Sequence, residues 1–237
     1  MGVDECHDGK CKKDNTDLLK FITSGLKNKG IDYWLDFGGL LGVVREGDMI
    51  DGDDDIDICA TMSEHDKIMA YFKEVNDDPN GLYTASANTA SERCEENALY
   101  KIRPKAADNK ALLDLFFFEE KDDGTLQSLW TSSDDTKVKT IFPTQEFLVA
   151  KWGFSVNIPH EPESRLKEKY GNDFMVPKND KKTIVKRVAR AGNVAGRCAK
   201  IKTHRNAKFT TVAILCLIVA AVLWYVYKKL AKKRKKK

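Results

Sequence analysis

The stretch from Phe209 to Tyr227, FTTVAILCLIVAAVLWYVY, contains no charged side chain. A helix of this length approaches the ~30 Å thickness of the hydrocarbon core of a bilayer. Globular helices seldom run this far without a polar face, which argues against a buried core helix. Trp224, Tyr225 and Tyr227 gather at one end, where interfacial aromatic residues belong, and a polybasic tail follows over residues 228–237. We predict one C-terminal transmembrane helix over residues 209–227.

The start of the chain lacks the apolar segment of a secretory signal. We therefore expect insertion from the C-terminal end, as in a tail-anchored membrane protein, with the remainder of the chain on the cytosolic side. The expected organisation is a disordered start over residues 1–15, a globular domain over 16–180 and a basic juxtamembrane linker over 181–208, followed by the helix and the tail.

The net charge of +4 hides a strong division along the chain. From Lys181 onward there are 18 Lys and Arg and no acidic residue, which leaves 22 of the 40 basic residues against all 36 acidic ones, a net charge of −14, before that point. The basic linker fits binding to anionic membrane lipids. It carries no interleaved aromatic residues, and the adjacent apolar run already explains its charge, so no nucleic-acid partner is expected.

The six cysteines are scattered and one lies inside the apolar run, which excludes a disulfide framework. Reduced thiols fit a cytosolic domain. Cys6, His7 and Cys11 offer zinc-ligand chemistry at the start of the chain, but no second ligand pair accompanies them at a recognisable spacing. A polar, disordered terminus is the preferred interpretation.

Helical and strand patterns alternate through the acidic part, which indicates an α/β fold of the α+β kind with a mixed sheet. Thr16 is a candidate cap for a first helix that ends near Gly30. The expected strands cover residues 31–37, 55–59, 99–103 and 112–118, and the further helices cover a short turn at 40–44, residues 63–75 with Ser63 as cap, and residues 163–170 before Gly171.

The stretch Asp51–Ile58, DGDDDIDI, places five carboxylates within eight residues. Like charges this close repel by about 1 kcal/mol per pair at ~4 Å even in water, so a cation is expected to compensate. Asp55 and Asp57 project from one face of the predicted strand, and Asp53 joins them where the strand begins.

Asp114 is isolated within the apolar run LLDLFFF, where an unpaired carboxylate is very costly to bury. We therefore expect Asp114 to complete a metal site with Asp53, Asp55 and Asp57. Oxygen ligands of this kind suit Mg²⁺ or Mn²⁺, which bridge substrate phosphates. Upstream, Gly38 and Gly39 permit a close approach of backbone N–H groups to a phosphate, and Arg45 is the nearby candidate to bind its oxygens.

Two other interpretations of the acidic stretch remain open. An EF-hand calcium loop that starts at Asp53 would place Asp55, Asp57 and Glu64 at ligand positions, but Ile58 stands where the loop needs glycine. A solvated acidic turn without any ion is the other interpretation.

The order of GIDYWLDFGGLLGVVREGDMIDGDDDIDI, LLDLFFF and NIPHEPESRLKEKYGNDFMVPK resembles the LicD family of phosphotransferases over about residues 16–178. That family includes phosphocholine transferases and fukutin-type ribitol-phosphate transferases. Two departures from its pattern are Gly38-Gly39 in place of the usual Gly-Thr and Asp51-Gly52 in place of Pro-Trp. The resemblance implies a polymerase β-type nucleotidyltransferase fold. It also implies that Asp55 and Asp57 are the metal-binding pair, with Asp53 on a further acidic position and Asp114 as third carboxylate.

The activity that the resemblance implies is metal-dependent transfer of a phosphoalcohol, such as phosphocholine, ribitol phosphate or glycerol phosphate. The donor would be CDP-linked and the acceptor a hydroxyl of a glycan or glycoconjugate at a membrane. A nucleotidyltransferase that moves NMP, a calcium-binding membrane protein and an inactive adaptor of the same fold are the alternatives. A screen of donors separates the first of these from phosphoalcohol transfer.

Overall fold

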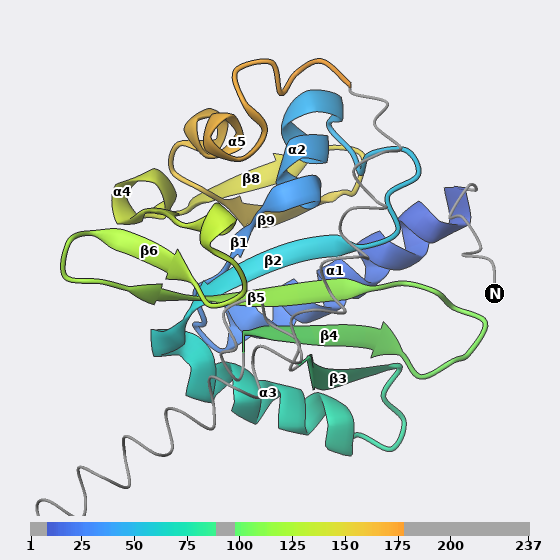
Figure 1. Ribbon diagram of the computed structural model, residues 1–237. Coiled ribbons are helices and arrows are strands. Elements are labelled where there is room, and N and C mark those ends of the chain that lie inside the picture. The colour runs from blue at the N-terminus through green and yellow to red at the C-terminus, as the bar shows by residue number, and fades with distance from the viewer. Residues whose placement is uncertain (1–8, 89–97, 178–237) are drawn as a thin grey trace, which may run out of the picture.

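The computed structural model describes residues 9–88 and 98–177, which form a mixed α/β fold around one curled sheet (Figure 1). The sheet has seven strands, and a separate two-stranded hairpin stands beside it. The strands of the sheet are β1 (Trp34–Leu35), β2 (Ile56–Thr61), β3 (Tyr83–Asn88), β4 (Leu99–Pro104), β5 (Leu113–Glu120), β6 (Thr125–Ser128) and β7 (Thr136–Lys137). The hairpin consists of β8 (Gln145–Val149) and β9 (Phe154–Ile158).

The sheet runs in the order β1-β2-β5-β4-β3, and β6 joins β5 to β7. The only parallel pair is β2 with β5, and the remaining strand pairs of the described sheet are antiparallel. The crossover between β2 and β5 contains a helix and the β3–β4 pair, as a parallel connection requires a long return segment. The beginnings of β2 and β5 therefore lie side by side at one end of the sheet.

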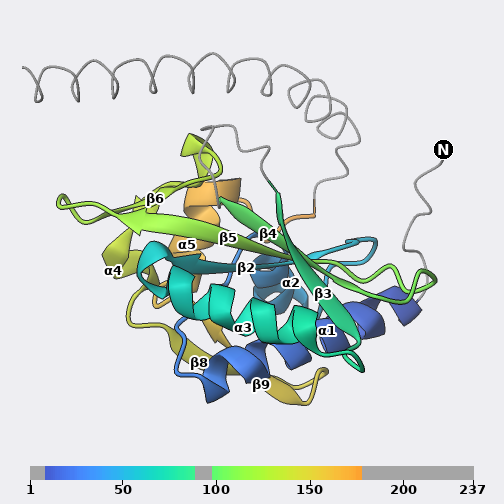
Figure 2. The same ribbon diagram turned by 90° about the horizontal axis from the view of Figure 1, so that it is seen from below.

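Two long helices cover one face of the sheet, as the two views show (Figures 1 and 2). The helices of the fold are α1 (Gly9–Asn28), α2 (Phe37–Glu46), α3 (His65–Asp77), α4 (Val138–Ile141) and α5 (Pro162–Tyr170), with short 3₁₀ turns at Met62–Glu64 and Ser132–Asp134. Leu18 and Ile22 of α1 and Phe72 of α3 pack in one core cluster with Ile58 and Leu115 of the sheet. Alternation along the strands sends Cys59, Phe116 and Phe118 to the opposite face, where they form a second buried cluster with Phe37 of α2 and Ile141 of α4.

The first helix begins earlier than predicted. Thr16 is not its cap, because α1 starts at Gly9 and the Thr16 hydroxyl donates to the carbonyl of Lys13 inside the helix. The predicted disordered start is therefore wrong for residues 9–15. Polar contacts with residues far along the chain hold this part of α1 in place, and no local sequence pattern predicts them. Lys12 donates to the Met49 carbonyl, and the Asn15 side chain bonds to the backbone of Asp54 and Leu112, just before β2 and β5.

The predicted strand over residues 31–37 is also wrong in extent. Strand β1 covers Trp34–Leu35 alone, and α2 already begins at Phe37. Gly38 and Gly39 therefore lie in the first turn of a helix rather than in a break before it. The reason is the carboxylate of Asp36, which accepts from the Phe37 N–H and caps the helix at that point.

The other expected elements are confirmed within a few residues: strands β2, β4 and β5, and helices α3 and α5. Ser63 is not the cap of α3, because the helix follows the Met62–Glu64 turn. Strands β3, β6, β7 and the β8–β9 hairpin were not predicted. Strand β7 is only two residues long, and the sequence YTASAN of β3 has no large apolar residue after Tyr83, so these strands give a weak pattern of alternation.

The predicted transmembrane helix over residues 209–227, the basic segments beside it and the side chains of Cys6, His7 and Cys11 lie outside the described residues. Among the helices of residues 9–88 and 98–177, none combines the length and the apolar character needed to cross a membrane.

Candidate functional site

Three carboxylates converge where the parallel strands β2 and β5 begin. Asp57 of β2 stands opposite Asp114 of β5 in the strand register, and Asp55 lies just before β2, two residues ahead of Asp57. Oxygen atoms of Asp55, Asp57 and Asp114 all lie within 4.8 Å of one another. The structure therefore brings together the three aspartates that the sequence analysis combined from two distant segments.

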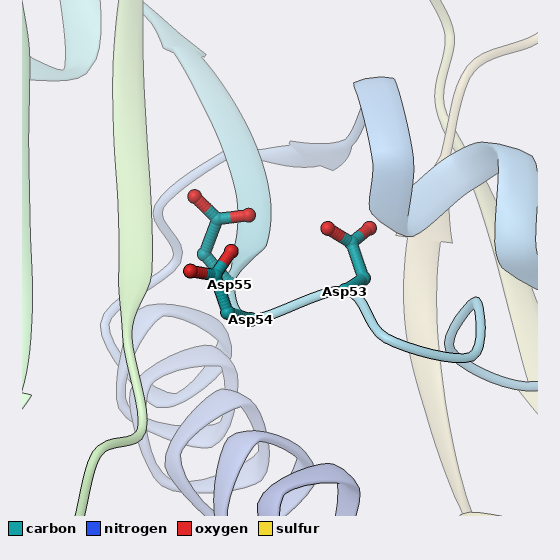
Figure 3. Close-up of side chains that lie close together, drawn as sticks. All are labelled: Asp53, Asp54 and Asp55. Carbon is teal, nitrogen blue, oxygen red and sulfur yellow. The ribbon is translucent and has the colours of Figure 1, made fainter. Parts of the chain in front are cut away.

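The loop before β2 adds a second group of carboxylates. Oxygens of Asp53, Asp54 and Asp55 lie within 4.8 Å of one another, so Asp55 belongs to both groups. Figure 3 shows Asp54 and Asp55 at the beginning of β2 and Asp53 on the side of the loop that faces α2. Asp54 is exposed, whereas Asp114 is buried with 5% of its surface accessible. The cluster thus runs from solvent into the sheet, which a fully solvated acidic turn would not do.

Burial and mutual repulsion disfavour the charged forms of these carboxylates. Burial, followed by the charges of Asp53 and Asp114, raises the pKa of Asp55 to about 7. Burial and the neighbouring Asp55 raise the pKa of Asp57 well above its ordinary value, and burial also raises that of Asp114, against the effect of Lys101. A bound cation would offset this repulsion and favour the charged forms of the carboxylates.

The first turn of α2 presses directly against the cluster. A Cβ atom on Gly38 would lie 2.6 Å from Oδ2 of Asp53. A Cβ atom on Gly39 would lie 2.9 Å from Cδ1 of Leu35 and 3.5 Å from the carbonyl oxygen of Asp57. Glycine at both positions is therefore what lets the helix approach the acidic loop and strand β2. Phe37 precedes them with a φ of 47°, a strained value for a residue with a side chain.

A buried ion pair that the sequence analysis missed fixes this helix end. Nε of Arg165 in α5 lies 3.0 Å from both carboxylate oxygens of Asp36, and each of these two side chains is 1% exposed. Trp34 also donates to Asp36 through its indole nitrogen at 3.1 Å. Asp36 and Arg165 are far apart in the sequence, and no motif links them. An aspartate after a strand and an arginine in a polar helix are both common, so the sequence does not predict that they pair.

Asn15 of α1 is a second residue that the sequence analysis missed. Its side chain donates to the carbonyl of Asp54 at 3.2 Å and accepts from the N–H of Leu112 at 2.8 Å. These two partners precede β2 and β5, so one buried amide joins the two chain segments that carry the carboxylates. Asn15 is therefore a positioning residue, and α1 contributes to the site through it.

The structure does not place the Arg45 side chain among the carboxylates. Its guanidinium donates to Glu46, with Nη2 at 2.6 Å and Nε at 3.1 Å from Oε1. Arg45 follows Gly38 by two helical turns, about 10 Å along the axis of α2. The structure thus connects Gly38 and Gly39 to the cluster directly, while the guanidinium of Arg45 is bound elsewhere.

The EF-hand interpretation is wrong. The segment that would form the calcium loop, residues 53–64, contains the whole of strand β2 and a 3₁₀ turn, and Ile58 is a buried strand residue. An EF-hand needs a loop between two helices with a sharp turn at that position. The carboxylates are instead arranged on a strand and its neighbour, with oxygen as the sole donor type, which suits a hard divalent cation such as Mg²⁺ or Mn²⁺.

A family model described as the nucleotidyltransferase domain of LicD, FKTN and FKRP matches residues 30–161. The matched segment covers more than half of the chain and contains every carboxylate of the cluster. The protein belongs to the LicD family. This LicD-family chain is therefore a member of a family of phosphotransfer and nucleotidyl-transfer proteins, and the family resemblance stated from the motifs is confirmed.

Solved structures similar to this LicD-family chain include ANT(2″)-Ia in complex with adenylyl-2″-tobramycin, at 13% identity and a TM-score of 0.45, covering 82% of this chain and 98% of that one. Another is the lincosamide antibiotic adenylyltransferase LnuA with lincomycin bound, at 14% identity and a TM-score of 0.43, covering 67% and 94% of the two chains. No curated protein matches the chain.

Proposed function

We propose that this LicD-family protein transfers a phosphoalcohol, of the phosphocholine or ribitol or glycerol phosphate type, from a CDP-linked donor to a hydroxyl of a glycan or glycoconjugate. The observation that carries the proposal is the convergence of Asp55, Asp57 and Asp114 within a family domain built for phosphoryl chemistry. In the reaction the acceptor oxygen forms a bond to the phosphorus that bears the alcohol. The bond from that phosphorus to the bridging oxygen breaks, CMP leaves, and the hydroxyl proton passes to a carboxylate of the cluster.

Mg²⁺ or Mn²⁺ is the cofactor that we propose, held by Asp55, Asp57 and Asp114 with Asp53 beside them. Bound there, the ion would neutralise charge on the diphosphate of the donor. The protein contributes the arrangement itself: the register of β2 and β5 fixes Asp57 opposite Asp114, and Asn15 joins the segments that precede them.

The beginning of α2 is the proposed phosphate-binding element. The first N–H groups of any helix have no partner within the helix and carry partial positive charge. Gly38 and Gly39 present this end beside Asp53 without a side chain in the way. Arg45 is proposed as a further substrate-binding residue, provided that its guanidinium leaves Glu46 when a donor binds.

A nucleotidyltransferase that moves NMP is the second candidate, favoured by the description of the matching domain. The two activities need the same carboxylates but different donors. The test is to incubate the full chain with CDP-choline, CDP-ribitol, CDP-glycerol or nucleoside triphosphates, each with a glycan acceptor and Mg²⁺. We expect metal-dependent release of CMP with one CDP-linked donor. Release of pyrophosphate from a triphosphate, with no CMP from any CDP-linked donor, would favour the second candidate.

The membrane location is proposed from the sequence alone. Residues 209–227 would anchor the chain as a single C-terminal span, the basic residues on either side would bind anionic lipid headgroups, and the catalytic domain would face the cytosol. We propose the same domain boundaries as in the sequence analysis with one change, since the first helix of the described domain starts at Gly9 rather than at residue 16.

A further inference from the structure

Lys101 stands directly beside the metal-type carboxylates. Its Nζ lies 2.9 Å from Oδ1 and 2.6 Å from Oδ2 of Asp114, so the ammonium group contacts both oxygens of the most buried carboxylate of the cluster. Lys101 of β4 is opposite Asp114 of β5, which is opposite Asp57 of β2. A base and two acids thus form one row across three adjacent strands.

The row continues with polar residues on the same open face. Arg103 projects from β4 two residues after Lys101 and its charge also lowers the pKa of Asp114, against the larger effect of burial. On the next strand, Ser86 is opposite Lys101 and Thr84 is opposite Arg103. Between these two basic residues Ile102 is fully buried in the core on the other face. Side chains that bind cations therefore adjoin side chains that bind anions on one surface.

The Lys101–Asp114 pair conflicts with the use of Asp114 as a metal ligand. An ammonium group cannot ligate a cation, and here it contacts both oxygens that an ion would need. The lysine side chain is 23% exposed and flexible, so it has both solvent access and room to turn. Arg45, by contrast, is two helical turns from the glycines that touch the cluster, which leaves the anion-binding role beside the carboxylates to another residue.

We propose that Lys101 is a phosphate-binding residue that serves as the counterion of Asp114 until a divalent cation binds. Once Asp114 turns its oxygens to the ion, the ammonium group of Lys101 is released next to it and binds a phosphate oxygen of a diphosphate ligand. The inference rests on the proposed function for the identity of the ion site. It adds the residue that recognises the anionic part of the donor.

Two measurements on the full chain in detergent separate this role from that of a plain structural ion pair. The first is the affinity for Mn²⁺ alone, from the electron paramagnetic resonance of free Mn²⁺. The second is the affinity for pyrophosphate at saturating Mn²⁺, by calorimetry. The variants are Lys101→Gln and Lys101→Arg. The matched control is Lys105→Gln, which removes the same charge from an exposed residue whose ammonium group donates to the Asp78 carbonyl in the turn after α3 rather than to a carboxylate of the cluster.

For Lys101→Gln we expect Mn²⁺ alone to bind up to about ten-fold tighter, because a positive charge beside the ion has gone. Pyrophosphate should bind about ten-fold weaker, since hydrogen bonds to a charged group are among the stronger ones. Lys101→Arg should retain most of the pyrophosphate affinity, and Lys105→Gln should match the wild type in both measurements.

Weaker Mn²⁺ binding by Lys101→Gln would overturn the proposal, since Lys101 would then serve only to orient Asp114. Unchanged pyrophosphate affinity would overturn it as well, since the lysine would then be a counterion alone. Failure of the wild type to bind Mn²⁺ would overturn both this inference and the proposed function. A wild type that binds Mn²⁺ and pyrophosphate but releases no CMP from any CDP-linked donor would refute the proposed donor. The role of Lys101 would then still be decided by the Mn²⁺ and pyrophosphate affinities of the Lys101 variants.

Discussion

Asp57 and Asp114 face each other across the only parallel strand pair in the described sheet, with Asp57 on β2 and Asp114 on β5. Two carboxylates in one row, with Asp55 beside them, destabilise the metal-free fold, because burial and like charge both oppose ionisation. The fold keeps this arrangement by means of contacts elsewhere, among them the Asn15 amide and the Asp36–Arg165 ion pair. The stability of the site should therefore respond to charge, protons and metal in a predictable direction.

Asp55→Asn and Asp57→Asn should leave the metal-free protein as stable as the wild type or more so, by about 1 kcal/mol for each like-charge pair removed. At a concentration of 100 times its dissociation constant, Mg²⁺ should stabilise the wild type by about 2.7 kcal/mol. Both variants should lose most of this gain and most of the activity. Thermal unfolding with and without Mg²⁺ measures the effect, and the exposed Asp51→Asn is the control. A wild-type melting temperature that ignores Mg²⁺ and Mn²⁺ would contradict a metal site.

The metal-free protein should become less stable as the pH rises from about 4 to about 7. The pKa of Asp55 rises from 3.8 to about 7 on folding, chiefly through burial. In that interval the folded state binds more protons than the unfolded state, so the free energy of unfolding falls with increasing pH. Urea unfolding in the presence of a chelator, at several pH values, measures the slope. Asp55→Asn should make the slope shallower, and an identical slope in this variant would show that Asp55 titrates normally.

The carboxylates of the site could be predicted from the sequence, whereas the strand register and the side chains that hold them in place could not. The alternation in DIDI and the lone Asp114 in an apolar run predicted two strands with carboxylates on one face, because strand periodicity is local. The register that sets Asp57 opposite Asp114, and Lys101 beside them, depends on strand order, which no local pattern contains. Asn15 and the Asp36–Arg165 pair join segments far apart in the chain, so they were found only in the folded structure.

Arg165→Met should cost about 3–5 kcal/mol in the free energy of unfolding. The substitution leaves the Asp36 carboxylate buried without its cationic partner, and an uncompensated buried charge is strongly destabilising. The control is Lys167→Met in the same helix, whose exposed pair with Glu163 at 3.4 Å should be worth less than about 1 kcal/mol. Urea unfolding compares the two variants. Equal losses would mean that the buried pair contributes no more than an exposed one.

The full chain should remain in the membrane pellet after alkaline extraction, whereas a chain truncated after residue 180 should appear in the supernatant. The reason is the charge-free run over residues 209–227. Protease added to intact microsomes should digest the catalytic domain if it faces the cytosol. Release of the full chain by alkali would contradict the span, and protection from protease would instead place the domain in the lumen.

Gly38→Ala and Gly42→Ala should have opposite effects, although both place a methyl group into close contact within α2. At Gly42 the new Cβ would lie 2.5 Å from the backbone oxygen of Asp48, which cannot rotate away. We expect that variant to lose about 1–3 kcal/mol of stability through overpacking.

At Gly38 the nearest atom to the new Cβ, at 2.6 Å, is the carboxylate oxygen of Asp53. This side chain can turn aside, and alanine favours the helix by up to about 1 kcal/mol, so the metal-free stability should be unchanged or higher. The displaced Asp53 should then weaken stabilisation by Mg²⁺. Chemical unfolding with and without Mg²⁺ distinguishes the two effects, and a Gly38→Ala variant that responds fully to Mg²⁺ would remove Asp53 from the proposed ion site.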